Sequence, residues 1–377
     1  MSERGRLLYV ANDAGYFLAH HLPVAVGAGA AGYEVHVAAP ATERASEITA
    51  HEFHFHPITM SRGNLSVWKE MRAIWGLIGL YRRLKPRLVH QITIKPALYG
   101  GIAARLAGVP AMVSIITGTG YVFQSNRYRA RLLRAWVAFA LRLVFTHANS
   151  AVIFQNPDDR NTFVHRGIVP SEKTALILGC GVNLNRFTPQ PPPDGAPVVM
   201  FASRMLWDKG VGEFVDAARL LRQCGADARF VLVGDADPGN PASVPGEQLA
   251  AWRDSGDVEW WGHRTDMPEV LAQASILCLP STYGEGLPQI LIEAAASGLA
   301  IVTTDWPGCR EVVRHRDNGI LVPVKDVKTL ANALGELIRD RDLRERMGAR
   351  GREIAVAEFS VDKVVAENLE VYRRLLP

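Results

Sequence analysis

Short apolar runs alternate with amphipathic segments along nearly the whole chain. Seven runs in the first half have the length and composition of buried strands, at residues 7–11, 33–39, 53–59, 88–91, 111–116, 151–154 and 174–178. Six more lie at residues 198–202, 229–233, 258–261, 276–279, 300–303 and 320–322. Between most of them the apolar positions recur at helical spacing, for example over residues 67–84 and 128–144. This alternation predicts parallel sheets with helices on both faces.

A proline-rich stretch at residues 189–197 interrupts the alternation and is typical of a linker between domains. The sequence therefore predicts two doubly wound, Rossmann-like α/β domains over residues 1–188 and 198–360. Residues 361–377 form a last helical segment, which we expect to cross back to the first domain. The length of 377 residues agrees with two domains of roughly 150 residues each.

The composition is that of a soluble globular protein, with 48% hydrophobic and 21% charged residues. The first apolar run is too short for a secretory signal, and no stretch approaches the ~20 apolar residues of a spanning helix. We therefore expect a cytoplasmic protein, at most peripheral to a membrane. Four cysteines (Cys180, Cys224, Cys278, Cys309) lie far apart with no histidine at metal spacing, which predicts buried free thiols and no metal site.

The net charge of +4 conceals an asymmetry between the two halves of the chain. Residues 1–188 carry 21 Lys and Arg against 10 Asp and Glu, whereas the remainder carries 21 against 28. Such a split indicates that the first half faces something anionic, which can be lipid, phosphate or nucleic acid.

The loop after the strand at 198–202 contains Arg204 and Lys209 and then opens into a helix. Two cations five residues apart near a helix N-terminus can hold both phosphates of a nucleoside diphosphate. The alternative interpretation is a solvated basic loop.

The loop after the strand at 276–279 contains Glu285 and leads into a helix predicted at residues 287–297, with Pro288 in its first turn and Glu293 about two turns in. A carboxylate on an apolar helix needs a partner, which ribose hydroxyls would supply, while Glu285 could meet a sugar. The amides of Gly286, Leu287 and Gln289 would add an anion site. The alternative for Glu293 is a structural carboxylate that caps a neighbouring loop.

Two further loops follow strands of the second half and could contact a base or phosphate. One contains Gly234 and Asp235, and the other contains His263 and Arg264. Each is weak evidence alone.

Glu285 and Glu293 form an E-x7-E pattern, which together with Arg204, Lys209 and Gly234 resembles the nucleotide-sugar domain of retaining GT-B glycosyltransferases of the family 4 type. Over residues 203–213, 238–241, 260–267 and 279–311 the chain is similar to bacterial enzymes that extend undecaprenyl-diphosphate-linked sugars in exopolysaccharide, capsule, O-antigen or N-glycan assembly. The resemblance implies a GT-B fold with a UDP-sugar donor, retention at the anomeric carbon, and no metal or other cofactor.

The resemblance also implies roles for individual residues. Arg204 and Lys209 would hold the diphosphate leaving group, Glu293 would bind the ribose, and Glu285 would face the donor sugar.

The first domain departs from the family pattern in two places. Where relatives have a glycine-rich turn after the first strand, only Gly15 and Asn12 are candidates for the approach to the diphosphate. Where many relatives carry a histidine after the fifth strand, Thr117 and Thr119 stand instead. Candidates on the acceptor side are therefore Thr117, Thr119, His20, His21 and Lys95. Lys95 follows a strand end and could pair with an acceptor diphosphate, or could simply cap a loop.

Two helical segments of the first half, residues 67–84 and 127–143, are both basic and aromatic. Over residues 127–143 the side chains of Arg127, Arg131, Arg134 and Arg142 share one face, opposite Leu132, Trp136, Phe139 and Leu143. The apolar face would pack on the sheet, and the arginines would be solvated or would meet anionic lipid headgroups on the inner face of the cytoplasmic membrane.

The leading hypothesis is thus a retaining transferase that moves a hexose or N-acetylhexosamine from a UDP-sugar to a lipid-linked saccharide. The alternatives are a GT-B enzyme with a soluble acceptor, a nucleotide-sugar epimerase, and a basic nucleic-acid-binding protein. No RNA-binding motif or recognition-helix pattern accompanies the positive charge, which disfavours the last of these.

Overall fold

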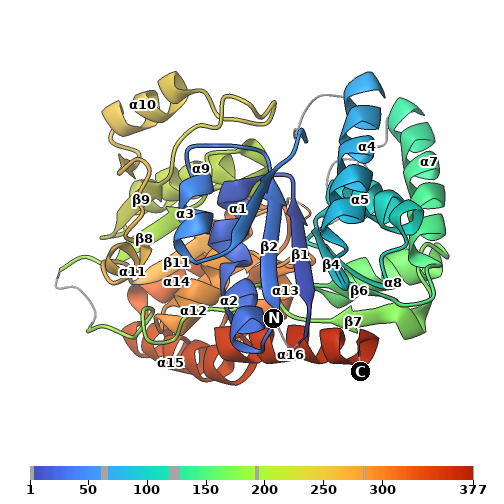
Figure 1. Ribbon diagram of the computed structural model, residues 1–377. Coiled ribbons are helices and arrows are strands. Elements are labelled where there is room, and N and C mark those ends of the chain that lie inside the picture. The colour runs from blue at the N-terminus through green and yellow to red at the C-terminus, as the bar shows by residue number, and fades with distance from the viewer. Residues whose placement is uncertain are drawn as a thin grey trace. The chain divides into compact units, whose positions relative to one another are not determined.

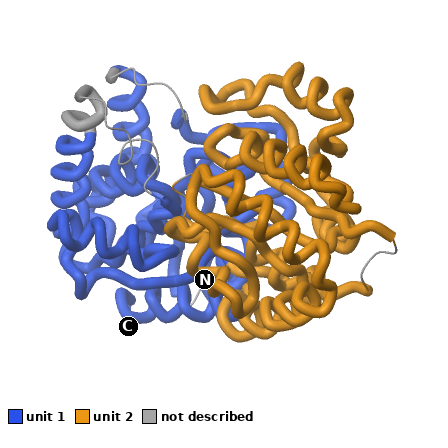
Figure 2. Tube along the Cα trace, turned by 180° about the vertical axis from the view of Figure 1, so that it is seen from behind, with its two compact units in different colours: residues 1–180, 362–377 blue, residues 181–361 orange. Residues whose placement is uncertain are grey.

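A computed structural model describes residues 4–60, 67–118, 128–191, 195–282, 284 and 286–376, with side chains described from Trp68 and from Arg134 in the helices that begin at residues 67 and 128. The chain divides into two compact units, residues 1–180 with 362–377, and residues 181–361 (Figure 2). The division falls at Gly181, earlier than the expected residue 188. The reason is that the segment after Gly181 packs within the second unit, where Val182 pairs with Ser360 and the carbonyl of Phe187 accepts a hydrogen bond from Arg352.

Unit 1 is a seven-stranded sheet with helices on both faces (Figure 1). Its strands are β1 (Arg6–Ala11), β2 (Glu34–Ala39), β3 (His54–Pro57), β4 (Leu88–Ile92), β5 (Ala111–Ile116), β6 (Ser150–Phe154) and β7 (Thr174–Leu176). Its helices are α1 (Ala14–His20), α2 (Leu22–Ala30), α3 (Ala45–Ala50), α4 (Val67–Leu84), α5 (Ile94–Ala107), α7 (Tyr128–Phe145), α8 (Pro157–His165), the 3-10 turn η1 (Ser171–Lys173) and the final α16 (Val361–Leu375). The strand order is β3-β2-β1-β4-β5-β6-β7, and each described pairing is parallel.

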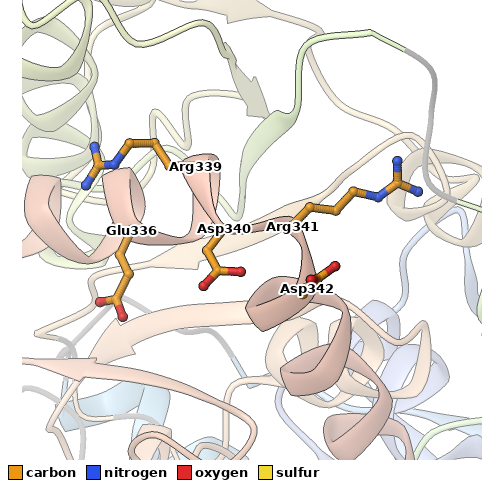
Figure 3. Close-up of a pocket in the computed structure, with 5 residues that line it drawn as sticks. All are labelled: Glu336, Arg339, Asp340, Arg341 and Asp342. Atoms are coloured by element: carbon orange, nitrogen blue, oxygen red, sulfur yellow. The ribbon is translucent and has the colours of Figure 1, made fainter.

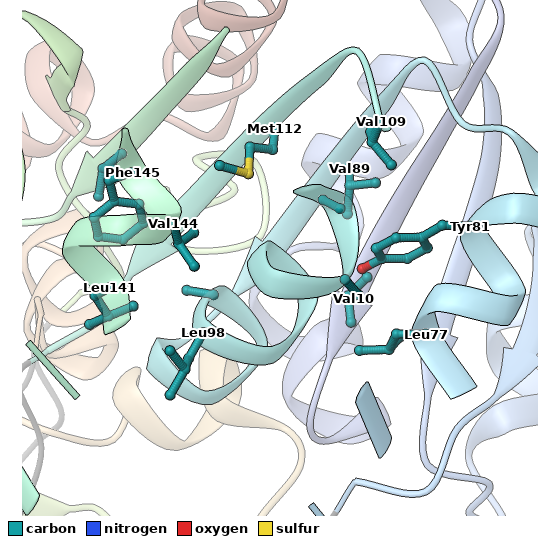
Figure 4. Close-up of a cluster of buried hydrophobic side chains, with 14 of the residues drawn as sticks. Val10, Leu77, Tyr81, Val89, Leu98, Val109, Met112, Leu141, Val144 and Phe145 are labelled. Atoms are coloured by element: carbon teal, nitrogen blue, oxygen red, sulfur yellow. The ribbon is translucent and has the colours of Figure 1, made fainter. Parts of the chain in front are cut away.

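Alternate residues of the strands point to opposite faces of the sheet and contribute to two separate hydrophobic cores. Leu8 and Val10 of β1 pack with side chains of α4, α5, α7 and α8, and Figure 4 shows part of this cluster around Tyr81. Leu7 and Tyr9 point to the opposite face, where α1, α2 and α16 cover them. The period-two alternation of a strand thus explains why the sheet needs helices on both sides.

The final helix belongs to unit 1 although it follows unit 2 in the chain. Tyr372 of α16 is fully buried there, and its hydroxyl lies 2.6 Å from His90 Nδ1 and 3.1 Å from the Tyr9 hydroxyl. These contacts join the end of the chain to β1 and β4.

Unit 2 is a six-stranded parallel sheet in the order β10-β9-β8-β11-β12-β13. Its strands are β8 (Val198–Ala202), β9 (Arg229–Val233), β10 (Glu259–Trp260), β11 (Ile276–Leu279), β12 (Ala300–Thr304) and β13 (Gly319–Val322). Its helices are the 3-10 turn η2 (Trp207–Lys209), α9 (Val211–Gln223), α10 (Gly246–Asp254), α11 (Met267–Leu271), α12 (Gln289–Ala296), α13 (Cys309–Val312), α14 (Val327–Arg339) and α15 (Arg341–Glu358). The predicted fold class is confirmed, and every predicted strand is present within a few residues of its expected bounds.

The orientation predicted for the helical segment after residue 127 is wrong in its described part. The side of α7 that packs inward carries Val137, Leu141, Val144 and Phe145. Trp136, Phe139 and Leu143, expected against the sheet, are instead 57%, 61% and 51% exposed. The helix is apolar on two sides, so its periodicity alone did not determine which side is buried. Arg127 and the side chain of Arg131 lie outside the described residues.

The cysteines are free thiols, as expected, but they are not all buried. Cys278 and Cys309 are buried and Cys180 is partly so, whereas Cys224 is exposed where α9 ends. Within the described residues, no helix is long and apolar enough to cross a bilayer.

Candidate active site

The strand order of unit 2 reverses between β8 and β11, since β9 and β10 extend the sheet on one side and β12 and β13 on the other. In doubly wound sheets, ligands bind beyond the carboxyl ends of the strands at such a reversal. The loops that leave β8 and β11 are the ones in which the sequence places Arg204, Lys209 and Glu285.

The loop after β8 is anchored in the core before it presents Lys209. Met205 and Leu206 are fully buried, and the turn η2 then leads into α9 through Gly210 at φ 81°. A Cβ at Gly210 would lie 2.2 Å from the carbonyl oxygen of Pro280, so only glycine lets this loop meet the one after β11. The Thr282 amide also donates to the Asp208 carbonyl at 2.9 Å. Lys209 is therefore held where the two loops touch.

Lys209 is only 6% exposed, which is rare for a lysine. Burial, and to a smaller extent the neighbouring Arg204, lower its pKa to about 7, with Cys309 acting in the opposite sense. Lys209 therefore loses its proton far more readily than an exposed lysine, and an anion placed beside it would favour the charged form. Cys309 was not a predicted site residue, because nothing in its local sequence indicates that α13 approaches η2.

Arg204 extends from the same loop and is about half exposed. Its Nη1 donates to Oδ2 of Asp237, which lies in the loop that follows β9, at 2.8 Å. Asp237 was not among the predicted site residues, although it lies two residues after the predicted Asp235. A phosphate that binds Arg204 must share the guanidinium with Asp237 or displace it.

The loops after β9 and β10 lie against the same edge. Gly234 has φ 129°, and a Cβ there would lie 1.9 Å from the carbonyl oxygen of Ser203, so the chain crosses the β8 loop at van der Waals contact. The Gly234 amide donates to the Gly262 carbonyl at 2.8 Å. Asp235 and His263 are exposed, whereas Arg264 pairs with Asp266 through its Nε at 2.8 Å.

Helix α12 begins at Gln289, two residues later than predicted, and Gly286, Leu287 and Pro288 precede it as buried residues. Glu293 is half-buried, and burial raises its pKa to about 7 against the opposing influences of Gln289 and Arg186. Gln289 Nε2 lies 3.3 Å from Glu293 Oε1 and donates to the Gly181 carbonyl at 2.9 Å. The side-chain amide of Gln289 thus contacts Glu293, and further hydrogen-bond donors would stabilise the ionised form of its carboxyl group. Glu285 lies outside the described residues.

In unit 1 the sheet order reverses between β1 and β4, and Gly15 and Lys95 lie near this point. Gly15 stands in the first turn of α1, which Asp13 caps by accepting from the Tyr16 amide at 2.6 Å. Lys95 is largely covered and forms an ion pair with Glu70 of α4 at 2.8 Å, so an acceptor phosphate would have to compete with that carboxylate.

The other acceptor-side candidates differ in position and in how buried they are. Thr117 follows β5 and is half-buried, and Thr119 lies outside the described residues. His20 lies at the end of α1, with its ring 4.5 Å from that of Tyr16. His21 is 3% exposed and lies beside His90 in the core, so a direct contact with an acceptor is not compatible with its position.

A shallow hollow in unit 2 has no part in this arrangement. It lies at the turn between α14 and α15 and is lined by Glu336, Arg339, Asp340, Arg341 and Asp342 (Figure 3). None of these residues belongs to a loop at the carboxyl edge of the sheet, and Asp340 already caps α15.

Two family models match the chain. Residues 6–156 match the glycosyl transferase 4-like model, and residues 196–340 match the model of glycosyl transferases group 1. Among curated proteins, the chain is 28% identical over 329 residues to the N,N'-diacetylbacillosaminyl-diphospho-undecaprenol alpha-1,3-N-acetylgalactosaminyltransferase of Campylobacter jejuni, covering 84% of each chain. It is 25% identical to the UDP-Gal:alpha-D-GlcNAc-diphosphoundecaprenol alpha-1,3-galactosyltransferase of Escherichia coli, covering 82% of this chain and 81% of that one.

Solved structures show the same fold at low sequence identity. The sucrose-phosphate synthase of Thermosynechococcus elongatus superposes with a TM-score of 0.82 at 20% identity, covering 98% of this chain and 99% of that one. The Anabaena protein HepE in complex with UDP gives 0.78 at 21% identity, covering 98% and 100%. With two family models that together span most of its length, two parallel sheets of the expected order and these neighbours, the chain belongs to the glycosyltransferases of the GT-B fold.

Proposed function

We propose that this glycosyltransferase moves a sugar from a UDP-sugar to a saccharide carried on undecaprenyl diphosphate, with retention at the anomeric carbon. The proposal rests above all on Lys209, a buried lysine held between the β8 and β11 loops at the sheet reversal, with Arg204 on the same loop. Two cations at this point suit a diphosphate better than any neutral ligand. The lipid-linked acceptor rests on the Campylobacter and Escherichia relatives, whose names specify undecaprenyl diphosphate sugars.

In the proposed reaction, the bond from the anomeric carbon to the β-phosphate oxygen breaks, and its electron pair leaves with UDP. The acceptor hydroxyl forms the new bond on the same face of the sugar, and its proton goes to the departing β-phosphate oxygen. Lys209 and Arg204 stabilise the negative charge that develops on the leaving diphosphate, a contribution that is worth about 10²–10³ in rate per well-placed donor. These fixed charges supply what a divalent cation would otherwise provide, so we propose that the reaction needs no metal.

The roles of the other residues in binding the UDP-sugar are proposed from their positions. Glu293 would accept hydrogen bonds from the ribose hydroxyls, which provide the donors that its carboxyl group lacks inside α12. Glu285 would face the sugar, following the E-x7-E pattern. Gly234 lets the β9 loop approach closely, and the exposed Asp235 and His263 are available for the base.

The test is a UDP-release assay with a panel of UDP-hexoses and UDP-N-acetylhexosamines and an undecaprenyl-diphosphate saccharide as acceptor. We expect turnover with at least one donor, an unchanged rate in EDTA, and an NMR spectrum of the product that shows the donor's anomeric configuration. Glu285→Ala should be inactive, and Glu269→Ala, exposed on α11, should retain activity. Inversion would contradict the mechanism, and equal rates with a soluble saccharide would favour the soluble-acceptor alternative.

We further propose that unit 1 docks on an anionic membrane through α4 and α7. On α4 the residues Trp68, Met71 and Trp75 are 86%, 45% and 62% exposed, and they lie at i, i+3 and i+7 on one face. Trp136, Phe139 and Leu143 form the same pattern on α7. Both helices pack against α5.

Basic side chains accompany these exposed aromatic residues. Lys69 and Arg72 on α4 and Arg142 on α7 are exposed. Tryptophan favours the interface between water and lipid, and each basic residue near an anionic surface contributes roughly 1 kcal/mol. The combination of exposed indoles and cations fits a bilayer that carries acidic headgroups, where a polyprenyl acceptor would also reside.

We expect the protein to sediment with vesicles that contain phosphatidylglycerol and to release them as salt increases. Lys69→Gln with Arg72→Gln should weaken binding by about tenfold or more, given roughly 1 kcal/mol per charge. Trp68→Ser with Trp75→Ser should weaken it at least as much, whereas Val356→Ser, an exposed apolar residue on α15 of unit 2, should have no effect. Absence of binding at low salt, or equal binding by all variants, would overturn the proposal.

A further inference from the structure

Three histidines and a glutamate gather at the β3 edge of the unit 1 sheet. Glu34 and His36 lie two residues apart on β2, and His54 and His56 lie two residues apart on β3. The parallel register pairs His36 with His54, and β3 is the outermost strand. Because residues two apart share a face of a strand, all four side chains emerge on the same face.

Three of these side chains direct potential ligand atoms toward one point. His36 Nε2 lies 3.0 Å from Glu34 Oε1, and His54 Nε2 lies 3.8 Å from the same oxygen. One ligand atom from each of the three residues falls within 4.8 Å of the others. Donors bound to one tetrahedral zinc ion at 2.0–2.1 Å are about 3.3 Å apart, so small side-chain rotations would complete such a geometry.

His56 holds the ring of His36 in the orientation that a metal ligand needs. His36 Nδ1 lies 3.0 Å from His56 Nε2, and the two rings stack with centroids 5.2 Å apart. When Nδ1 carries the proton and donates to His56, the lone pair of His36 Nε2 faces Glu34. Partners of this kind, behind the ligands themselves, fix the tautomer and orientation of metal-binding histidines.

We propose that Glu34, His36 and His54 bind a divalent transition-metal ion of the zinc class, with water in the fourth position. Two imidazoles and one carboxylate suit Zn²⁺, Ni²⁺ or Co²⁺ and do not suit Mg²⁺ or Ca²⁺, which prefer oxygen ligands. His36 is buried, whereas the side chain of His54 is 60% exposed, which leaves room for the water. The ion would join the short edge strand β3 to β2, a structural role that is separate from sugar transfer.

The cation that pairs with Glu34 leaves its carboxylate able to bind an ion through Oε1. Arg6 of β1 lies opposite Glu34 in the sheet, with its Nε 3.3 Å from both carboxylate oxygens, and can remain on Oε2 when Oε1 binds an ion. Arg83 also lies near the cluster, where together with burial it lowers the pKa of His56. The expectation of no metal site came from residue spacing along the chain, and the ligands come from two strands that only the sheet brings together.

The test uses the untagged full-length protein, stripped with EDTA and titrated with ZnCl₂ in competition with a chromophoric chelator. We expect one site per chain, no competition by Mg²⁺, and a visible absorption band of four-coordinate Co²⁺ when cobalt replaces zinc. His54→Asn removes an exposed ligand and should weaken zinc binding by at least 100-fold, and His56→Ala by about 10–100-fold. His51→Asn, an exposed histidine three residues before His54, is the matched control and should bind as the unaltered protein does.

Circular dichroism should show that the variants remain folded, since none of the three replaced histidines is fully buried. Equal affinity of His54→Asn and the unaltered protein would place the zinc elsewhere and overturn the proposal. So would the absence of binding at stoichiometric zinc, or an equal loss in His51→Asn. Because zinc affinity and the cobalt spectrum are the readouts, the result does not depend on the glycosyltransferase assay.

Discussion

Lys209→Met is expected to lower the rate of sugar transfer by about 10²–10³-fold while leaving the protein folded. Methionine keeps the length of the side chain in its buried position but removes the charge that would neutralise the leaving diphosphate. The measurement is kcat and KM in the UDP-release assay, with Lys328→Met as the control, since Lys328 is exposed on α14 of the same unit. Near-normal turnover of Lys209→Met would contradict the assignment of this residue.

The lowered pKa of Lys209 also predicts that the stability of the protein depends on pH through this residue. Its pKa of about 7 in the free protein lies below that of an unfolded lysine, so the folded state is penalised as pH falls from about 10 toward 7. Lys209→Met should therefore gain in melting temperature relative to the unaltered protein at pH 7, and gain less near pH 9.5.

UDP binding adds a second observable at this residue. A bound diphosphate raises the pKa of Lys209, so UDP binding at pH 8 should take up as much as one proton, measured by calorimetry in buffers of different ionisation enthalpy. UDP affinity should fall as pH rises above 7. Proton uptake that persists unchanged in Lys209→Met would assign it to another group.

Tyr372→Ala is expected to destabilise unit 1 by about 3–5 kcal/mol, the cost of deleting a large buried aromatic side chain. The ring is fully buried between α16 and the sheet, and its hydroxyl joins His90 and Tyr9. Since whole proteins are commonly stable by only 5–15 kcal/mol, this loss would be a large fraction of the total. Urea unfolding followed by circular dichroism measures it.

Two further variants separate packing from hydrogen bonding at this position. Tyr372→Phe keeps the ring but leaves the buried polar atoms of His90 and Tyr9 without this partner, at a cost of about 1–3 kcal/mol. Glu370→Ala, exposed on the same helix, should change stability by less than about 0.5 kcal/mol. If Tyr372→Ala unfolded no more readily than Glu370→Ala, α16 would contribute little to unit 1.

The strands and the fold class could be predicted because their signals are local. A run such as residues 198–202 is apolar at each position, and a buried parallel strand requires this whatever surrounds it. The loop with Arg204 and Lys209 was found for the same reason, since it follows directly on such a run. The position of the division between the units was less accurate, because Val182 joins unit 2 through a contact with Ser360 far along the chain.

The candidate site depended more on contacts between distant residues. Asp237 reaches Arg204 from another loop, and His21, a plausible acceptor-side residue in the sequence, lies in the core beside His90. On α7 the pattern offered two apolar sides, and packing against α5 determined which one is buried.

The sequence by itself determined the alternation of strands and helices, the two α/β domains, and the loops in which the candidate donor-site residues stand. These features follow from the chemistry of residues close together in the chain. Only the tertiary structure decided that Lys209 is buried with a lowered pKa, that Arg204 already has an acidic partner, and that Glu34, His36 and His54 meet. Burial and strand register bring together residues that are far apart in sequence, and the charge state of each group depends on those neighbours.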